Sequence, residues 1–93
     1  MGFEWDPEKA RINFRKHDGI RFEEAREVFD DPYAITISDN LSDENEQRFV
    51  AIGMGARGRV LVVVYAWRGA AVRIISARLA AAHERADYEE GLL

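Results

Sequence analysis

The sequence predicts an α+β domain in which short helices pack against an antiparallel β-meander sheet, in the order β-α-α-β-β-β-β-α. Apolar residues recur at helical spacing in two segments near the N-terminus, and four strand-like segments joined by short turns follow them. A chain of 93 residues that is 47% hydrophobic can bury one core. We therefore expect a single domain over residues 1–93.

The first expected elements are a short strand and a helix. Phe3 and Trp5 alternate with acidic residues, which indicates a strand with both rings on one side. Asp6-Pro7 is typical of a helix start, because aspartate accepts N–H bonds at the N-cap and proline needs no donor in the first turn. The glycine of Asp18-Gly19 is typical of a helix end. Within this helix, three residues form one stripe: Ala10, Phe14 and His17.

The rest of the chain predicts a second helix, four strands and a third helix. The second helix is expected over residues 21–30, because Asp31-Pro32 stops it. The strands are expected over residues 34–38, 47–54, 59–68 and 71–78, with a polar acidic loop over 39–45. Residues 60–65 are apolar on both strand faces, which predicts a central strand covered on both sides or, alternatively, one with a face left for a partner protein. The last helix, over 80–90, has few apolar residues, so we expect it to pack through small side chains or to lie exposed.

Composition excludes several classes of protein. The chain has no cysteine, which excludes disulfides, thiolate metal sites and cysteine nucleophiles and favours the cytoplasm. Its longest apolar run, Val60 to Trp67, is shorter than the roughly 20 residues of a membrane helix, so no membrane role is expected. Phosphate-binding glycine loops and serine-hydrolase elbows are absent. The two histidines, His17 and His83, lack further ligands at metal-site spacing, and we expect no metal or cofactor.

Charge is distributed unevenly along the chain. The net charge is -4, but residues 47–83 contain six arginines and no carboxylate. Such a segment can face an anion such as the phosphates of a nucleic acid. Alternatively, its arginines are the solvated ends of strand residues that cover an apolar face.

The spacing of the charged strand residues constrains a common site. Arg73 and Arg78 are five positions apart, so in an unbroken strand they point to opposite faces. They can share a site only if the strand bends or ends near Ser76-Ala77. Glu46 and Arg48 are two positions apart and are expected on the same side. A carboxylate beside an arginine is usually a structural ion pair, yet it also orients a guanidinium toward phosphate.

Short motifs occur in a fixed order along almost the whole chain. In the first half they are Phe3-Glu4-Trp5-Asp6, Lys9, Asn13, Arg15-Lys16-His17, Phe22-Glu23-Glu24-Ala25 and Val28-Phe29-Asp30-Asp31-Pro32. In the second half they are Glu46-Gln47-Arg48-Phe49, Ile52-Gly53, Gly58-Arg59, Leu61-Val62-Val63, Arg73-Ile74-Ile75-Ser76-Ala77-Arg78, Glu84-Arg85 and Tyr88. In order and spacing these motifs resemble the BrnT-type toxins of bacterial toxin-antitoxin systems. The turn over residues 18–21 is one residue longer than usual, and Ala81 replaces a common threonine, which removes a helix-capping side chain.

The resemblance implies a compact RelE-like toxin that cleaves RNA without a metal ion and arrests growth. It also implies neutralisation by a cognate BrnA-type antitoxin, with contact to promoter DNA only through that antitoxin, and it is compatible with a hetero-tetramer of the two proteins. Such cleavage needs a group that takes the proton of the ribose 2′-OH, cations that stabilise the phosphoryl oxygens, and an acid for the leaving 5′-oxygen.

The candidate catalytic residues follow from these requirements. Arginine suits charge stabilisation, because it stays charged and its fork matches phosphate; the candidates are Arg48, Arg73 and Arg78. Four candidates for proton transfer stay open: Lys16, His17, Glu46 and Tyr88. His17 has the alternative role of a cation at a helix C-terminus. The rival function is a noncatalytic protein-binding module, or a toxin that sequesters a protein target.

Overall fold

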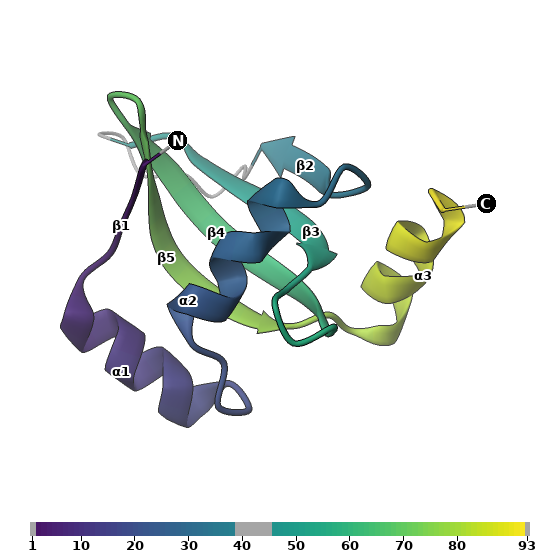
Figure 1. Ribbon diagram of the computed structural model, residues 1–93, viewed down its shortest axis with the longest axis horizontal. Coiled ribbons are helices and arrows are strands. Elements are labelled where there is room, and N and C mark those ends of the chain that lie inside the picture. Colours follow the sequence, from purple (N-terminus) through teal and green to yellow (C-terminus); the bar gives the residue numbers. More distant parts are fainter. Residues whose placement is uncertain (1, 39–45, 93) are drawn as a thin grey trace.

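The computed structural model describes residues 2–38 and 46–92 and contains a five-stranded sheet packed by helices (Figure 1). The elements are β1 (Gly2–Glu4), α1 (Pro7–Lys16), α2 (Phe22–Ala25), the 3-10 helix η1 (Arg26–Asp30), β2 (Ile35–Ser38), β3 (Arg48–Met54), β4 (Val60–Arg68), β5 (Ala71–Leu79) and α3 (Ala82–Glu90). The α+β class and the element order are confirmed, with boundaries within two residues of those expected. The expected loop over 39–45 lies outside the described residues. In the described part of the chain, no helix is long and apolar enough to cross a membrane.

The sheet is mixed, which corrects the expectation of a purely antiparallel meander. Its order is β1-β5-β4-β3-β2, and β2 to β5 form the expected antiparallel meander with β4 at the centre. However, β1 pairs in parallel with β5, with Phe3 opposite Val72. The helices that follow β1 carry the chain from one edge of the sheet to the other, where β2 begins. A strand of three residues gives no sequence signal for its partner, so this pairing was not predictable.

The second helix is divided into two types of turn. An α-helical turn, α2, continues as the 3-10 helix η1, where a single helix was expected. Phe22, Ala25 and Val28 are all fully buried and lie three positions apart. Residues three positions apart lie on the same side of both kinds of turn, so the whole segment presents this set to the core. This segment, with α1, covers one face of the sheet, which we call the helix face.

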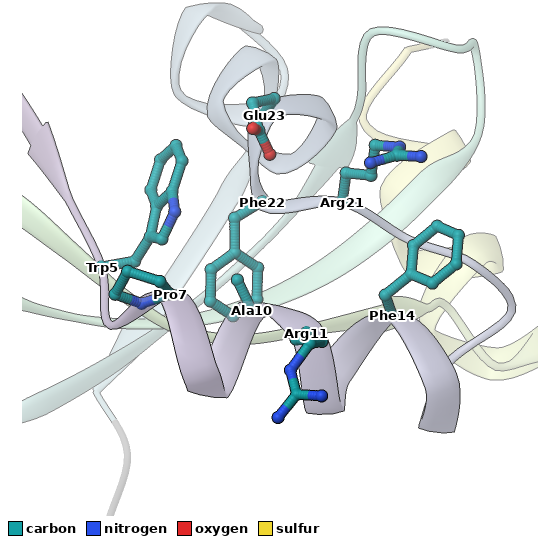
Figure 2. A pocket seen from close by; sticks show the side chains of 8 residues that line it. All are labelled: Trp5, Pro7, Ala10, Arg11, Phe14, Arg21, Phe22 and Glu23. Carbon is teal, nitrogen blue, oxygen red and sulfur yellow. The ribbon is translucent and has the colours of Figure 1, made fainter.

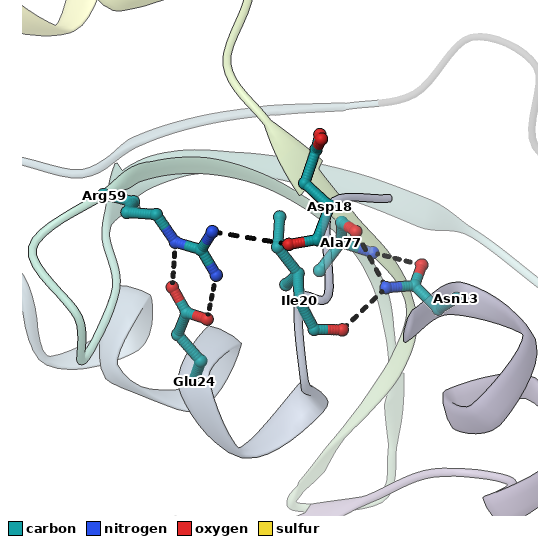
Figure 3. A network of polar contacts seen from close by, with 6 residues as sticks. All are labelled: Asn13, Asp18, Ile20, Glu24, Arg59 and Ala77. Atoms are coloured by element: carbon teal, nitrogen blue, oxygen red, sulfur yellow. Dashed lines mark hydrogen bonds and ion pairs between the residues drawn. The ribbon is translucent and has the colours of Figure 1, made fainter. Parts of the chain in front are cut away.

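One buried residue of α1 is polar. Ala10 packs against the core, but Phe14 is 39% exposed, so the predicted stripe is only partly buried. Asn13 is buried instead, and its side-chain amide donates to the Ala77 carbonyl at 2.8 Å and accepts from the Ala77 N–H at 3.0 Å (Figure 3). Because β1 pairs with β5 only as far as Arg73, Asn13 takes the place of a neighbouring strand at Ala77.

A partly buried ion pair fixes the turn between β3 and β4. Glu24 of α2 is 5% exposed and accepts from Nε and Nη2 of Arg59 at 3.0 and 2.7 Å. Arg59 also donates to the Asp18 carbonyl at 3.4 Å (Figure 3). The pair therefore connects this turn to α2 and to the end of α1.

The opposite face of the sheet, which we call the open face, carries α3 at one end. Tyr88 of α3 is buried there against a small apolar cluster of Ile52, Val62 and Ala80. The expectation that α3 packs through small side chains or lies exposed holds for most of the helix, but it missed Tyr88, the one large aromatic residue that anchors α3. Toward its other end, the open face carries arginines in place of apolar residues.

Candidate active site

Two arginines lie in one row across the three central strands of the open face. Arg48 of β3 is opposite Ala66 of β4, and Ala66 is opposite Arg73 of β5. We call this set the arginine row. The Cα atoms of its two arginines are two strand spacings apart, about 10 Å. Alanine between them leaves room for both guanidinium groups to lean toward a common ligand.

A β-bulge in β5 brings more of this strand to the open face. Tyr65 is opposite Ile74 and Val64 is opposite Ser76, so Ile75 has no partner on β4. The extra residue reverses the alternation of side chains. Three residues of β5 consequently lie on the open face: Arg73, Ser76 and Arg78. The bulge thus places Arg73 and Arg78 on one face, where an unbroken strand would have placed them on opposite faces.

Carboxylates hold the arginines of this region. Glu46 lies 4.0 Å from Nε of Arg48 and 3.2 Å from Nε of Arg68, so one carboxylate connects the ends of β3 and β4. Glu4 of β1 lies 3.8 Å from Nη1 of Arg73, which is longer than a hydrogen bond. The side chain of Arg73 is thus loosely held, and it is 26% exposed.

Arg78 lies on the same face but is tightly bound. Its Nη1 and Nη2 atoms donate to the two oxygens of Glu84 at 2.7 and 2.8 Å. These bonds lower the pKa of Glu84 to about 2, although burial alone would raise it. Glu84 also accepts from the Ala81 N–H at 2.8 Å, which caps α3 where the alanine side chain cannot. Arg78 therefore secures the start of α3.

Two of the expected proton-transfer residues lie beside the arginine row. Lys16 and His17, at the end of α1, line a cleft of about 190 Å³ between α1 and β5, which we call the α1–β5 cleft. Its other lining residues include Lys9, Ile12, Ile75 and Ser76. Because Ser76 also lies on the open face between Arg73 and Arg78, the cleft and the arginine row are adjacent.

Tyr88 is not brought to the arginine row. Its side chain is buried, and its hydroxyl donates to Oδ2 of Asp31 at 2.5 Å. Burial and this bond raise the pKa of Tyr88 to about 12. The bond ties α3 to the segment that precedes β2.

A second concave surface lies on the helix side of the molecule. This groove of about 350 Å³ runs between α1 and the start of α2, and Figure 2 shows the aromatic rings that form it. Trp5 meets Phe22 edge-on with ring centres 5.9 Å apart, and the Arg21 guanidinium lies 4.8 Å from the centre of the Phe14 ring. None of the seven expected site residues lines this groove.

Comparisons with known proteins agree with the fold and with the motifs. The sequence profile described as the ribonuclease toxin, BrnT, of type II toxin-antitoxin systems matches residues 5–84. This chain belongs to the BrnT toxin family. The 1.1 Å crystal structure of the Brucella abortus ribonuclease toxin BrnT is similar, with a TM-score of 0.68 and 25% sequence identity, over 87% of this chain and 97% of that one. The comparison with curated protein sequences found no match.

Membership of the BrnT family places this chain among ribonuclease toxins of type II toxin-antitoxin systems, and it implies an antitoxin partner. For such a chain the open face offers guanidinium groups suited to an RNA phosphate. Within the described residues, no group of three or more histidine, aspartate or glutamate side chains is placed to hold a metal ion.

Sequence reasoning missed three residues that lie beside or between the candidate site residues. Arg68 has the same strand parity as the alternate residues of β4 on the open face, so its position could have been predicted. Glu4 lies beside Arg73 only because β1 joins β5 in parallel. Ser76 depends on the bulge, for which a single strand sequence gives no signal.

Proposed function

We propose that this chain is an endoribonuclease that cleaves RNA without a metal ion, arrests growth in the cytoplasm and is neutralised by a BrnA-type antitoxin. In this proposal the toxin and the antitoxin form a hetero-tetramer. The complex contacts promoter DNA only through the antitoxin. The single observation that supports the catalytic part is the arginine row, with Arg48 and Arg73 in register across β4.

The reaction that fits this row is attack of the ribose 2′-oxygen on the adjacent phosphorus. A bond forms between the 2′-oxygen and phosphorus, the bond to the 5′-oxygen breaks, and the products are a 2′,3′-cyclic phosphate and a 5′-hydroxyl. Negative charge grows on the two nonbridging oxygens. Arg48 and Arg73 would bind these oxygens from two sides and stabilise the transition state more than the ground state.

Proton transfer is assigned to groups beside the row. His17 lines the α1–β5 cleft, and its imidazole ring can accept or donate a proton. Glu46 already orients Arg48 and Arg68, and it is the second candidate for the base. Lys16 contributes charge in the cleft. Arg78 and Tyr88 have structural roles in this proposal, because the first is engaged with Glu84 and the second with Asp31.

The test is cleavage of a defined RNA by the purified chain in the presence of EDTA. We expect wild type to release products with cyclic phosphate ends, and Arg73→Ala to lose about 100-fold or more in rate. Arg57→Ala is the matched control, because Arg57 is exposed in the turn between β3 and β4. This variant should cleave RNA at the wild-type rate. RNA that stays intact with EDTA but is cleaved with added Mg²⁺ would contradict metal independence.

The rival proposal is a toxin that acts by binding and sequestering a protein. It predicts growth arrest with intact RNA, both in cells and with the purified chain. It also predicts that Arg73→Ala keeps its toxicity unless the same arginine binds the target.

A further inference from the structure

The α1–β5 cleft has an unusual balance of charge. Lys9 and Lys16 are seven positions apart on α1, two helical turns, so both ammonium groups lie on the side of α1 that faces the cleft. Neither lysine forms an ion pair with any residue that the structure describes, and no carboxylate lines the cleft. On the open face, by contrast, Arg48, Arg68, Arg73 and Arg78 each have a carboxylate within 4.0 Å. The cleft therefore presents cationic charge that the described protein does not neutralise.

An apolar surface lies between the two lysines. Ile12 is 42% exposed and lies on α1 between Lys9 and Lys16. Ile75 faces it from β5, where the bulge leaves this residue without a partner on β4. Two isoleucines flanked by ammonium groups suit a flat apolar group attached to anions, which describes a nucleobase with its neighbouring phosphates. At about 190 Å³ the cleft is smaller than a site for a drug-sized ligand and suits a single base.

The cleft continues into the arginine row through Ser76. This residue lines the cleft and lies on the open face between Arg73 and Arg78. A single RNA strand with one phosphate on the arginine row can therefore pass Ser76 and enter the cleft, whose lining contains no carboxylate. His17, the candidate for proton transfer, lies at the same junction.

We propose that the α1–β5 cleft is a binding subsite for the nucleotide next to the scissile phosphate. Its base packs on Ile12 and Ile75, and its flanking phosphates bind Lys9 and Lys16. This inference rests on the proposed function, because the arginine row must hold the scissile phosphate. It adds three residues, Lys9, Ile12 and Ile75, that the reaction itself does not use.

The test measures the salt dependence of RNA binding. The probe is a 2′-O-methylated single-stranded oligoribonucleotide, which lacks the attacking hydroxyl, and its anisotropy is followed between 50 and 200 mM salt. Each lost phosphate contact on a single strand lowers the slope of log K against log salt by about 0.7. We expect Lys9→Ala/Lys16→Ala to lower the slope by about 1.4. Ile12→Ser should weaken binding with no change in slope.

The matched control is Arg15→Ala, because Arg15 is an exposed cation of α1 outside the cleft lining and should leave the slope unchanged. All four replaced side chains are exposed, and circular dichroism checks that the variants fold. A slope that stays at the wild-type value in the double lysine variant overturns the subsite. The subsite is also overturned if Arg15→Ala lowers the slope by as much per lost charge as the lysine variant does. That result would indicate general attraction of RNA to a basic helix.

This test fails separately from the proposed function. If the wild type does not cleave RNA but the lysine variant still loses slope, the cleft binds RNA without a neighbouring scissile phosphate, and the nuclease proposal falls. If the wild type cleaves RNA and the lysine variant keeps its slope, the nuclease proposal stands and the subsite falls.

Discussion

Tyr88 and Asp31 form the tether that holds α3 on the sheet. Asp31 Oδ2 accepts from the Tyr88 hydroxyl at 2.5 Å and from the Met54 N–H at 2.8 Å, and Oδ1 accepts from the Tyr33 N–H at 2.9 Å. Burial raises the pKa of Asp31, but these three bonds outweigh it and lower the pKa below the usual value. Asp31 is therefore charged and Tyr88 protonated at neutral pH, as a tether requires.

Tyr88→Phe should cost stability and leave catalysis intact. The change removes one hydrogen bond to a charged group, which contributes roughly 1.5–3 kcal/mol to the free energy of unfolding. Denaturant unfolding measures this loss, and RNA cleavage should be assayed under conditions where the variant is folded. If the rate falls about 100-fold while stability is unchanged, Tyr88 takes part in the reaction and the structural assignment fails.

The pair of Arg78 and Glu84 predicts an acid dependence of stability. The pKa of Glu84 is lowered from its usual 4.5 to about 2 in the folded state. A lowered carboxylate pKa stabilises the fold above pH 4.5, and this contribution disappears as pH falls through about 2. Glu84→Gln removes that dependence, so its free energy of unfolding should fall less between pH 5 and pH 2 than that of the wild type. Parallel curves for the two proteins would contradict the role of this pair.

Among the elements, α1 and β5 depend on one side chain for their junction. Asn13 satisfies both backbone groups of Ala77, and it also donates to the Ile20 carbonyl at 3.3 Å. The same junction forms the floor of the α1–β5 cleft. The amide of Asn13, together with the packing of Ala10 on the core, therefore sets the position of Lys16 and His17 relative to Ser76.

Asn13→Leu should loosen this junction. The variant leaves the N–H and carbonyl of Ala77 without their partner, and each unsatisfied buried group costs about 1–3 kcal/mol. We expect a free energy of unfolding lower by roughly 2–6 kcal/mol and faster hydrogen exchange at the Ala77 amide. Arg15→Leu on an exposed side of α1 is the control and should change neither quantity. Unchanged exchange at Ala77 in Asn13→Leu would show that another group holds the edge of β5.

Elements with strong local signals were predictable, whereas features set by strand pairing were not. Asp6-Pro7 predicted the start of α1, and Asp6 does cap that helix by accepting from the Glu8 N–H at 2.9 Å. A single regular helix was expected over residues 21–30, and the change to 3-10 turns at Arg26 was not predicted, because the spacing of Phe22, Ala25 and Val28 fits both kinds of helix. The bulge at Ile75 depends on which residues of β4 lie opposite, and the sequence of β5 alone does not contain that information.

At the scale of the whole molecule, the chain gathers cationic groups in one region despite a net charge of -4. The expected residues Arg48 and Arg73 lie in register in the arginine row, and Lys16 and His17 lie in the adjacent cleft. Arg78 shares their face but is engaged with Glu84, and Tyr88 lies apart on Asp31. Residue types and spacing predicted which groups carry charge. Which of them act together depends on the register of three strands.

The central claim is that Arg48 and Arg73 hold the same scissile phosphate. The most direct measurement is single-turnover RNA cleavage by Arg48→Ala, Arg73→Ala and the double variant, with Arg57→Ala as the control. We predict a loss of about 100-fold for each single variant. The double variant should lose less than the product of the two, since both groups stabilise one transition state. A single variant that cleaves as fast as Arg57→Ala, or two losses that simply multiply, would contradict a shared phosphate site.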